Sequence, residues 1–353
     1  MIYGTVIIGS SPAMLLEAIL RAQQGHGPTI VIEAKDQLGG NWSPQTRFGH
    51  QIDNGPHLLY NFNSDMSELF ATLTEITGCS FEEMAPPPRS ESRLNPAMLE
   101  FSFGFHGSKT RKRLRAIRAV LARHWLPVLK PQKYWRPQGG LSNIVRQFHL
   151  KLEALGVEIR TSVAVQSLRE LPNGTVEVSL DNGEHIIGES VKATAASLPL
   201  LAGVSSSFTL PELKSRRYGQ AYIYLRNARK NVFSFFRCFH DPQMFLAAEL
   251  GSSAQPPLPE GCTVLSVNLT SGSLADEINN SEILDFLRRK KLVEGINGSP
   301  EIHCVEWEVI DLPIVTNEIT NQLNTELDSI EFIHCHNLVR TLYSRLELAG
   351  ALN

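Results

Sequence analysis

The sequence has no long hydrophobic run and few cysteines. A transmembrane helix needs about 20 predominantly apolar residues, and no window of the 353-residue chain approaches that length. The first apolar run follows Met1 directly, without the basic residues that begin a secretion signal. The five cysteines are odd in number and form no Cys-x-x-Cys pair, which argues against a disulfide framework. We therefore expect a cytoplasmic protein.

The sequence also lacks an excess of charge of one sign. It contains 33 basic and 36 acidic residues, a formal net charge of −3. This balance gives no general attraction to nucleic acid, and it disfavours a dedicated nucleic-acid binder. The chain is longer than the roughly 250–300 residues at which a single hydrophobic core stops growing. Two lobes are therefore expected.

The first forty residues have the pattern of a strand, a helix and a second strand. Residues 5–8 are a short apolar run ended by Gly9, and residues 29–32 form a second such run. Between them, apolar residues recur at helical spacing until Gly25. Glu33 follows the second strand, where a carboxylate in a dinucleotide-binding unit accepts hydrogen bonds from a ribose. The pattern predicts a Rossmann-like unit.

The predicted phosphate loop departs from the usual glycine pattern. Against Gly-x-Gly-x-x-Gly the chain offers Gly9, Ser11 and Met14, so only the first glycine is present. Gly9 can form the tight turn, Ser11 adds a hydroxyl donor, and the start of the following helix presents free N–H groups to an anion. From this loop alone, a βαβ unit that binds no nucleotide is an equally good interpretation.

A second motif follows directly. A Gly-Gly doublet stands at 39–40, and the segment Asp-Asn-Gly-Pro-His stands at 53–57. In order and spacing, these residues resemble the FAD-binding family of flavin amine oxidases, protoporphyrinogen oxidases and phytoene desaturases, and also UDP-galactopyranose mutase. Two residues without Cβ let the backbone pass close to a flat cofactor. The resemblance implies FAD as the cofactor.

The resemblance extends further along the chain. Residues 134–141 look like the family's Pro-x-Gly-Gly segment, which opens a helix, and Val165 stands at the position whose backbone meets the adenine. Near the end of the chain, 330–337 are similar to the family's last return to the flavin, although His336 replaces the usual glycine before Asn337.

The resemblance thus implies a set of candidate cofactor-binding residues, of which His57 is also the candidate catalytic residue. They are Gly9, Ser10, Ser11, Pro12, Ala13, Glu33, Ala34, Lys35, Gly39, Gly40, Asn41, Trp42, Gly55, Pro56, His57, Leu58, Val165, His336 and Asn337. For His57 the alternative is a loop histidine that hydrogen-bonds the backbone.

The middle of the chain does not resemble a cofactor domain. Short aromatic or β-branched runs separated by turn residues predict an antiparallel sheet. The implied fold is α/β: a Rossmann-like FAD-binding domain of the glutathione-reductase and amine-oxidase type, made of 1–70, 134–200 and 300–353. A discontinuous α+β substrate domain, made of 71–133 and 205–299, contains the antiparallel sheet. Four aromatic residues in it either line an apolar substrate cavity or form sheet core: Phe233, Phe235, Phe236 and Phe239.

Residues 109–123 contain seven basic and no acidic residues, with apolar residues at helical spacing. This amphipathic pattern fits a peripheral contact with an anionic membrane or a phosphorylated ligand, or a solvated helix face. His303, Cys304 and 334–336 lack the paired spacing of structural zinc sites, so no metal is predicted.

We expect an FAD-dependent oxidoreductase that oxidises a C–H or N–H bond of a small apolar or amine substrate, with the flavin supplying the chemistry. Two alternatives remain open. One is a flavin-dependent sugar-nucleotide isomerase like UDP-galactopyranose mutase, which Gly-Gly-Asn at 39–41 favours. The other is a binding or scaffold protein that kept the fold while its phosphate loop degenerated.

Overall fold

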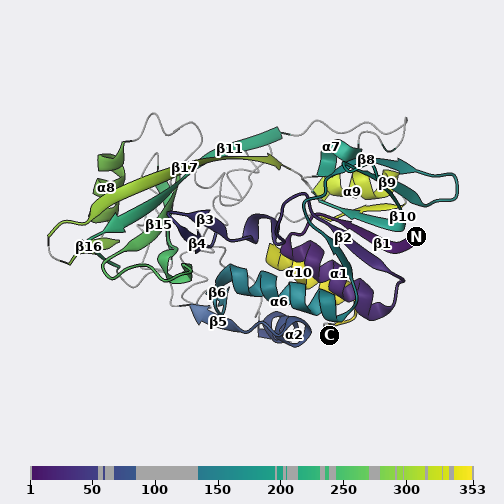
Figure 1. Cartoon of the computed structure of the whole chain (residues 1–353), viewed down its shortest axis with the longest axis horizontal. Helices are drawn as coiled ribbons and strands as arrows, with labels where there is room; N and C mark the ends of the chain where they lie inside the picture. The colour runs from purple at the N-terminus through teal and green to yellow at the C-terminus, as the bar shows by residue number, and fades with distance from the viewer. Residues whose placement is uncertain are drawn as a thin grey trace, which may run out of the picture.

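The computed structural model contains two main β-sheets, one in each half of the elongated view of Figure 1. One sheet has seven strands and the other has five. The structure describes residues 2–54, 59, 67–84, 134–194, 197–201, 204, 214–230, 235–237, 244–269, 279–290, 292–296, 298–314, 317–327, 329–333 and 338–351.

The seven-stranded sheet has the strand order β7-β2-β1-β10-β9-β8, with β18 beside β10. Its parallel strands are β7 (Glu158–Arg160), β2 (Thr29–Ile32), β1 (Ile2–Ile8), β10 (His185–Ala193) and β18 (Ile330–Phe332). Strands β8 (Val165–Glu170) and β9 (Val176–Leu180) extend it as an antiparallel hairpin. The predicted strand at 29–32 is confirmed, and all four of its residues are buried, as expected in a parallel sheet covered on both faces.

Helices cover both faces of this sheet. On one face, α1 (Pro12–Gln24), α2 (Ser67–Thr77), α6 (Gly140–Ala154) and α10 (Leu338–Leu348) share one hydrophobic cluster with strand residues such as Ile7 and Val31. On the other face, residues of α7 (Leu198–Leu201) and α9 (Asn317–Glu326) pack against a second cluster. Gly25 ends α1 in the left-handed conformation with φ 71°, as the sequence predicts.

The five-stranded sheet is antiparallel and has the order β13-β14-β15-β11-β17. Its strands are β11 (Lys214–Arg226), β13 (Phe235–Arg237), β14 (Met244–Glu249), β15 (Thr263–Leu269) and β17 (Glu301–Ile314). Helix α8 (Asn280–Arg289) covers one face. It begins with a capping box, in which Asn279 and Glu282 each bond the other's backbone N–H.

Shorter elements complete the described chain. Strands β3 (Gln45–Arg47) and β4 (His50–Ile52) form a hairpin, β5 (Phe81–Met84) pairs with β6 (Tyr134–Pro137), and β12 (Ala228–Lys230) pairs with β16 (Val293–Gly295). Two 3-10 turns are η1 (Gly40–Trp42) and η3 (Gly251–Ser253). Of the helices in the described residues, none combines the length and the apolar content needed to cross a membrane.

The fold class expected from the sequence is confirmed, but two boundaries between the predicted lobes differ. Strand β17 pairs with β11 from Glu301 to Ile314, so residues 301–314 lie in the antiparallel sheet and not in the cofactor lobe. Helix α2 shares its core with α1 and α6, so residues 71–77 lie with the cofactor lobe. Both differences arise from long-range packing, which a local pattern does not show. The rest of the proposed division stays a prediction.

Candidate functional site

The predicted phosphate turn lies between the end of β1 and the start of α1. Gly9 has φ +88°, and its amide donates to the Ile32 carbonyl at 2.8 Å, which ties the turn to the end of β2. Ser11 occupies the N-cap position of α1 without a side-chain cap to the helix. The first-turn amides of a helix lack carbonyl partners within the helix and attract anions. Met14, in place of the third glycine, is fully buried in the core.

The glycine doublet lies against this turn. The Gly39 amide donates to the Ser10 carbonyl at 3.1 Å and to Ser10 Oγ at 3.0 Å. Gly40 has φ +57°, and a Cβ on it would lie 3.5 Å from Ser11 Cα. A Cβ on Gly39 would lie 2.8 Å from Val145 Cγ2, so there is no room for a side chain there. Two segments about thirty residues apart therefore form one glycine-lined backbone cradle.

Glu33 lies at the end of β2 with its carboxylate buried beside the turn. Its Oε2 accepts from the Ser10 amide at 2.9 Å and from Ser10 Oγ at 2.5 Å, and its Oε1 accepts from the Lys35 amide at 2.9 Å. An ionised carboxylate has about four lone-pair positions, so acceptor capacity remains for a further donor. The interaction of Glu33 with a ribose stays a prediction.

The segment before β8 lies alongside Glu33 and Lys35. The Ser162 amide donates to the Lys35 carbonyl at 2.8 Å, and the Val163 amide donates to the Glu33 carbonyl at 3.2 Å. Val165 begins β8 two residues later. The structure therefore brings together the two segments, 33–35 and the approach to Val165, that the resemblance assigns to the adenosine end of the cofactor.

The other candidate residues differ in their surroundings. Pro12 and Ala13 are buried in the first turn of α1, and Trp42 is buried in the core beside that helix, whereas Asn41 is exposed. The Trp42 side chain thus stabilises the loop that carries the doublet. Six candidates lie outside the described residues: Gly55, Pro56, His57, Leu58, His336 and Asn337. Their roles stay predictions.

Asp53 joins the second motif to the start of α6. Its carboxylate accepts from the Leu141 amide at 3.0 Å and from the Ser142 amide at 3.3 Å. A Cβ on Gly140 would lie 2.6 Å from Asp53 Oδ2, which explains the glycine there. Burial raises the pKa of Asp53, and the two backbone donors partly oppose this rise. The sequence placed Asp53 in a motif but gave no signal of its role as a helix cap.

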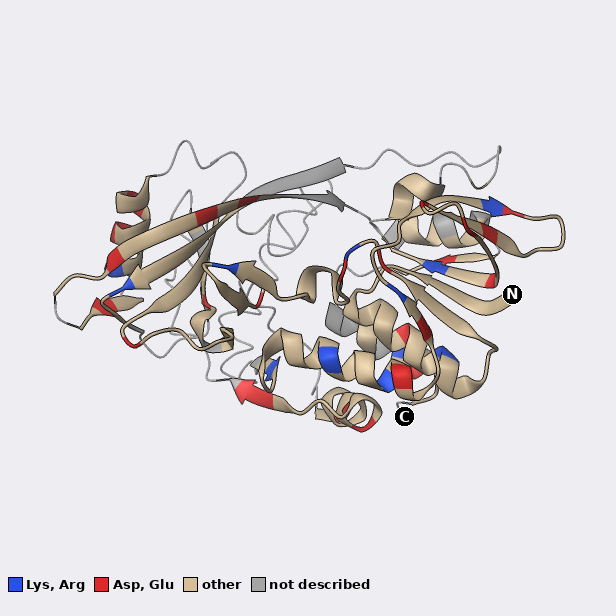
Figure 2. Ribbon diagram, in the orientation of Figure 1, with Lys and Arg blue, Asp and Glu red and all other residues tan. Residues whose placement is uncertain are grey.

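Arg47 joins the β3–β4 hairpin to the antiparallel sheet. Its guanidinium donates from Nη1 to Glu306 at 3.1 Å and from Nη2 to Glu308 at 2.7 Å, and its Cζ lies 3.5 Å from the centre of the Tyr222 ring. Figure 2 shows acidic positions along the ribbon of β17. Tyr222 donates its hydroxyl to Asn54 Oδ1. No motif in the sequence pointed to Arg47, because its acidic partners are more than 250 positions away.

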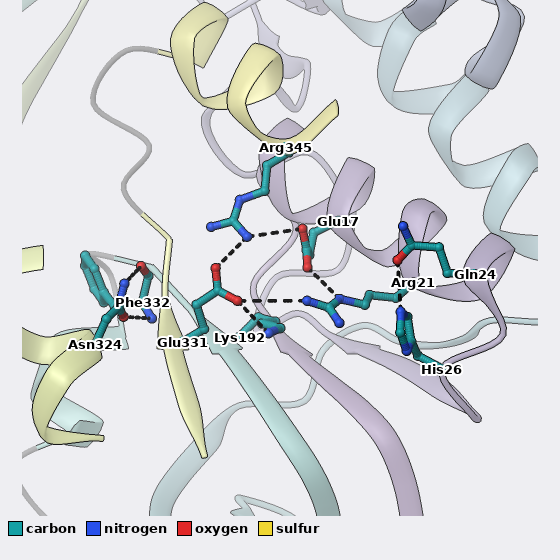
Figure 3. Close-up of polar contacts among 9 residues, drawn as sticks. All are labelled: Glu17, Arg21, Gln24, His26, Lys192, Asn324, Glu331, Phe332 and Arg345. Atoms are coloured by element: carbon teal, nitrogen blue, oxygen red, sulfur yellow. Dashed lines mark hydrogen bonds and ion pairs between the residues drawn. The ribbon is translucent and has the colours of Figure 1, made fainter. Parts of the chain in front are cut away.

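A network of ion pairs lies between the helices α1 and α10 and the seven-stranded sheet. Figure 3 shows Arg345 of α10 reaching both Glu17 of α1 and Glu331 of β18, at 3.5 and 2.5 Å, while Lys192 of β10 lies 2.6 Å from Glu331. Arg21 adds a 2.8 Å pair with Glu17. Burial alone would raise the pKa of Glu331, but Arg345 and Lys192 outweigh it and lower the pKa. The network fixes the C-terminal helix to α1.

Family comparisons agree with this arrangement. Residues 7–73 match the model of an NAD(P)-binding Rossmann-like domain, and residues 79–290, more than half of the chain, match that of the flavin containing amine oxidoreductases. The chain belongs to the flavin-containing amine oxidoreductase family. It is a flavin-dependent oxidoreductase whose cofactor is FAD, as the resemblance implied. No curated protein sequence matches the chain.

Several solved structures share the fold over nearly the whole chain. A UDP-galactopyranose mutase in its reduced form has a TM-score of 0.68 at 13% identity, with 98% of this chain and 94% of that chain covered. A candidate protoporphyrinogen oxidase from Exiguobacterium has a TM-score of 0.65 at 13% identity, with 98% of each chain covered. A redesigned putrescine oxidase variant has a TM-score of 0.61 at 11% identity, with 99% and 98% covered. At these identities the likeness shows the fold alone.

The described residues around the predicted phosphate turn fit FAD. Gly9, Gly39 and Gly40 all have positive φ angles, and a Cβ would meet nothing within 4 Å at Gly9 and nothing closer than 3.5 Å at Gly40, whereas Val145 and Ser43 occupy the space beside Gly39. The buried carboxylate of Glu33 stands at one side of the cradle, next to Ser10. Within the described ranges, no three His, Cys, Asp or Glu side chains gather closely enough to hold a metal ion. The pair His303 and Cys304 belongs to β17, and 334–336 lie outside the described residues.

Proposed function

We propose that this oxidoreductase oxidises a C–H or N–H bond of a small organic substrate held on the antiparallel sheet. The observation that carries the proposal is the β3–β4 hairpin, which leaves the glycine cradle after Trp42 and docks on the sheet through Arg47. After the hairpin, Asp53 returns to the start of α6 in the cofactor lobe. A molecule on this face of the sheet would therefore meet the cofactor lobe directly.

The protein's own residues would bind and orient the two reactants. When bound, FAD supplies the electron-accepting chemistry of the reaction. Gly9 and Gly40 would let the cofactor approach the backbone closely, Glu33 would accept hydrogen bonds from its ribose, and the first-turn amides of α1 near Ala13 would bind its phosphates. The buried sheet face would exclude water from the reacting bond. No side chain of the described residues is required as a nucleophile, and the role of His57 stays a prediction.

The class of substrate is a finer proposal. The family description supports an amine as the substrate. The aromatic residues in 233–239 support an apolar substrate cavity as a prediction from the sequence. Their side chains lie outside the described residues. The test is anaerobic mixing of the FAD-loaded protein with a panel of primary and secondary amines and of apolar compounds, followed by visible absorbance. Bleaching of the flavin bands by a panel member supports the proposal. A flavin that dithionite reduces but no panel member reduces would count against it.

A sugar-nucleotide isomerase is the second candidate, supported by Gly-Gly-Asn at 39–41. Such an enzyme needs its flavin reduced beforehand and shows no net redox change. Incubation of the dithionite-reduced protein with UDP-galactopyranose separates the two candidates. Ring-contracted product would replace our first proposal with this one. A protein that takes up no FAD would instead support the scaffold alternative.

Binding of an anionic partner by 109–123 and a cytoplasmic location also stay proposals. The basic segment lies outside the described residues, and its support is the run of seven basic side chains in fifteen positions. Co-sedimentation with acidic vesicles at low and high salt tests it. The combined change of Arg111, Arg113 and Arg115 to Glu should abolish a salt-sensitive interaction and leave FAD bound. Equal sedimentation of parent and variant would contradict the idea.

A further inference from the structure

The two faces of the antiparallel sheet differ in polarity. The face that packs on α8 is apolar, with Ala221, Ile223 and Val267 fully buried in one cluster. The opposite face receives the β3–β4 hairpin through Ile52. Next to that contact it carries four buried polar side chains: Gln220, Tyr222, Ser266 and Asn268, which are 5%, 0%, 0% and 8% exposed. Buried polar groups in the middle of a sheet are uncommon without a hydrogen-bonding role.

Strand register brings these polar side chains together. Gln220 of β11 is paired with Asn268 of β15 on one side and with Glu308 of β17 on the other. Tyr222 is paired in the same way with Ser266 and Glu306. Directly opposed residues in an antiparallel pair have Cβ atoms roughly 4.5–5.5 Å apart. The polar row, defined as Gln220, Ser266 and Asn268, is therefore compact enough to contact one small molecule.

Two atoms of the polar row are buried and without a partner. Ser266 Oγ and Asn268 Oδ1 have no hydrogen-bond partner in the described structure, and neither does Arg47 Nε, whose guanidinium lies over Tyr222. Leaving a buried donor or acceptor unpaired opposes folding, because the group has lost its water. Such groups concentrated on one face of one sheet indicate a ligand that completes their hydrogen bonds.

The polar row lies near the segment that joins the antiparallel sheet to the cofactor lobe. Gln220 lies two residues from Tyr222 toward Lys214, and Figure 1 shows this end of β11 extending toward the cofactor lobe. Tyr222 itself donates to Asn54, which follows the Asp53 cap of α6. The row is therefore next to the segment that connects the sheet with the cofactor lobe.

We propose that the polar row binds a neutral, hydrogen-bonding group of the substrate, such as an amide or a hydroxyl, away from the bond that is oxidised. This inference rests on the proposed function and narrows its substrate class. The row itself offers uncharged groups, and beside it the single cation Arg47 is shared by the two carboxylates Glu306 and Glu308. A hydrocarbon would leave the unpaired atoms unsatisfied, an anion would meet the two carboxylates beside the row, and the row's own groups carry no charge to pair with an ion.

The variants Ser266→Ala and Asn268→Leu test the inference on the FAD-loaded protein, with Asn268→Ala as a second variant should Leu not fit. Thr29→Val is the matched control, because Thr29 Oγ1 is also buried and unpaired but lies on β2 of the other sheet. The probes are benzamide and its apolar isostere cumene. Their dissociation constants are measured from changes in the flavin absorbance, and stability is measured by urea unfolding.

The parent should bind benzamide more tightly than cumene. Each row variant should weaken benzamide binding by roughly 2- to 10-fold, leave cumene binding unchanged or stronger, and unfold at the same or a higher urea concentration. Thr29→Val should change neither dissociation constant. Unchanged benzamide binding, or a loss of stability in the row variants, would overturn the inference by showing that the groups have structural partners. This equilibrium test needs no turnover, so its failure differs from a failure of flavin reduction.

Discussion

At the scale of single residues, one carboxylate supports the fold and is also the predicted acceptor for the cofactor. Glu33 holds the Ser10 amide and hydroxyl and the Lys35 amide, and it retains capacity for a ribose hydroxyl. Ser10 in turn accepts from Gly39, so the phosphate turn and the doublet share one hydrogen-bonded centre. Substitutions at these positions should separate the two roles.

Glu33→Ala should raise the dissociation constant of FAD by roughly 10- to 150-fold, the effect of losing a charge-assisted hydrogen bond. Ser10→Ala is the comparison, since it removes the hydroxyl that contacts both Glu33 and the Gly39 amide but leaves the carboxylate in place, and it should change the affinity by a few-fold at most. Equilibrium titration of the apoprotein with FAD measures both, with circular dichroism as the check on folding. FAD affinity equal to that of the parent in Glu33→Ala would contradict the assignment.

Gly40→Ala should weaken FAD binding more than it weakens the fold. Any side chain at φ +57° is strained by about 1–2 kcal/mol, but at Gly40 the added Cβ would also stand in the cofactor cradle. Gly25→Ala is the matched control, because it has φ +71° with nothing within 4 Å and lies at the far end of α1. Full flavin occupancy in Gly40→Ala, with equal loss of stability in both variants, would show that Gly40 only forms a turn.

At the scale of elements, two charged clusters join segments that are distant in the sequence. The ion network of Glu17, Arg21, Lys192, Glu331 and Arg345 connects α1, β10, β18 and α10. The Arg47 cluster connects the β3–β4 hairpin with β17 and β11. Each cluster should therefore determine how firmly one element docks on another.

Acid should weaken the docking of α10 through Glu331. Its pKa is lower in the folded protein than in the unfolded chain. The stability it contributes is therefore present above the unfolded pKa, near 4.3, and is lost as the pH falls through the folded value. Glu331→Gln should lower the unfolding free energy at pH 7 by about 1.5–3 kcal/mol. The unfolding free energy of this variant should also fall less steeply than that of the parent as the pH drops below 5. Glu347→Gln on the exposed face of α10 is the control. Identical urea-unfolding profiles against pH in parent and Glu331→Gln would contradict this account.

Removal of the Arg47 guanidinium should loosen the hairpin from the sheet. Arg47→Met leaves Glu306 and Glu308 without their cation. Because these carboxylates are 41% and 32% exposed and water screens them, the loss should be about 1–2 kcal/mol. Adding Glu306→Gln and Glu308→Gln to Arg47→Met should recover part of that loss, because the carboxylates are then neutral. Urea unfolding of the single and combined variants measures both effects. A combined variant less stable than Arg47→Met would contradict the role of Arg47 as their counter-ion.

At the scale of the whole molecule, local patterns predicted the elements of the cofactor lobe but not the contacts between distant segments. The βαβ unit followed from two apolar runs, a helical spacing and Gly25, all within about thirty residues. Strand β17 joined the antiparallel sheet through pairing with β11, which lies about ninety positions earlier. For the same reason the sequence did not predict the contacts of Arg47, the Asp53 cap or the polar row, because only the fold brings their partners together.

The central claim is that the glycine cradle and Glu33 hold FAD for oxidation of a substrate on the antiparallel sheet. The most direct test is the visible absorbance of the purified protein after loading with FAD, recorded before and after anaerobic addition of the amine and apolar panel. The account predicts about one bound flavin per chain, bleached by at least one panel member and recoloured by air. A protein that remains colourless after FAD loading would contradict the account.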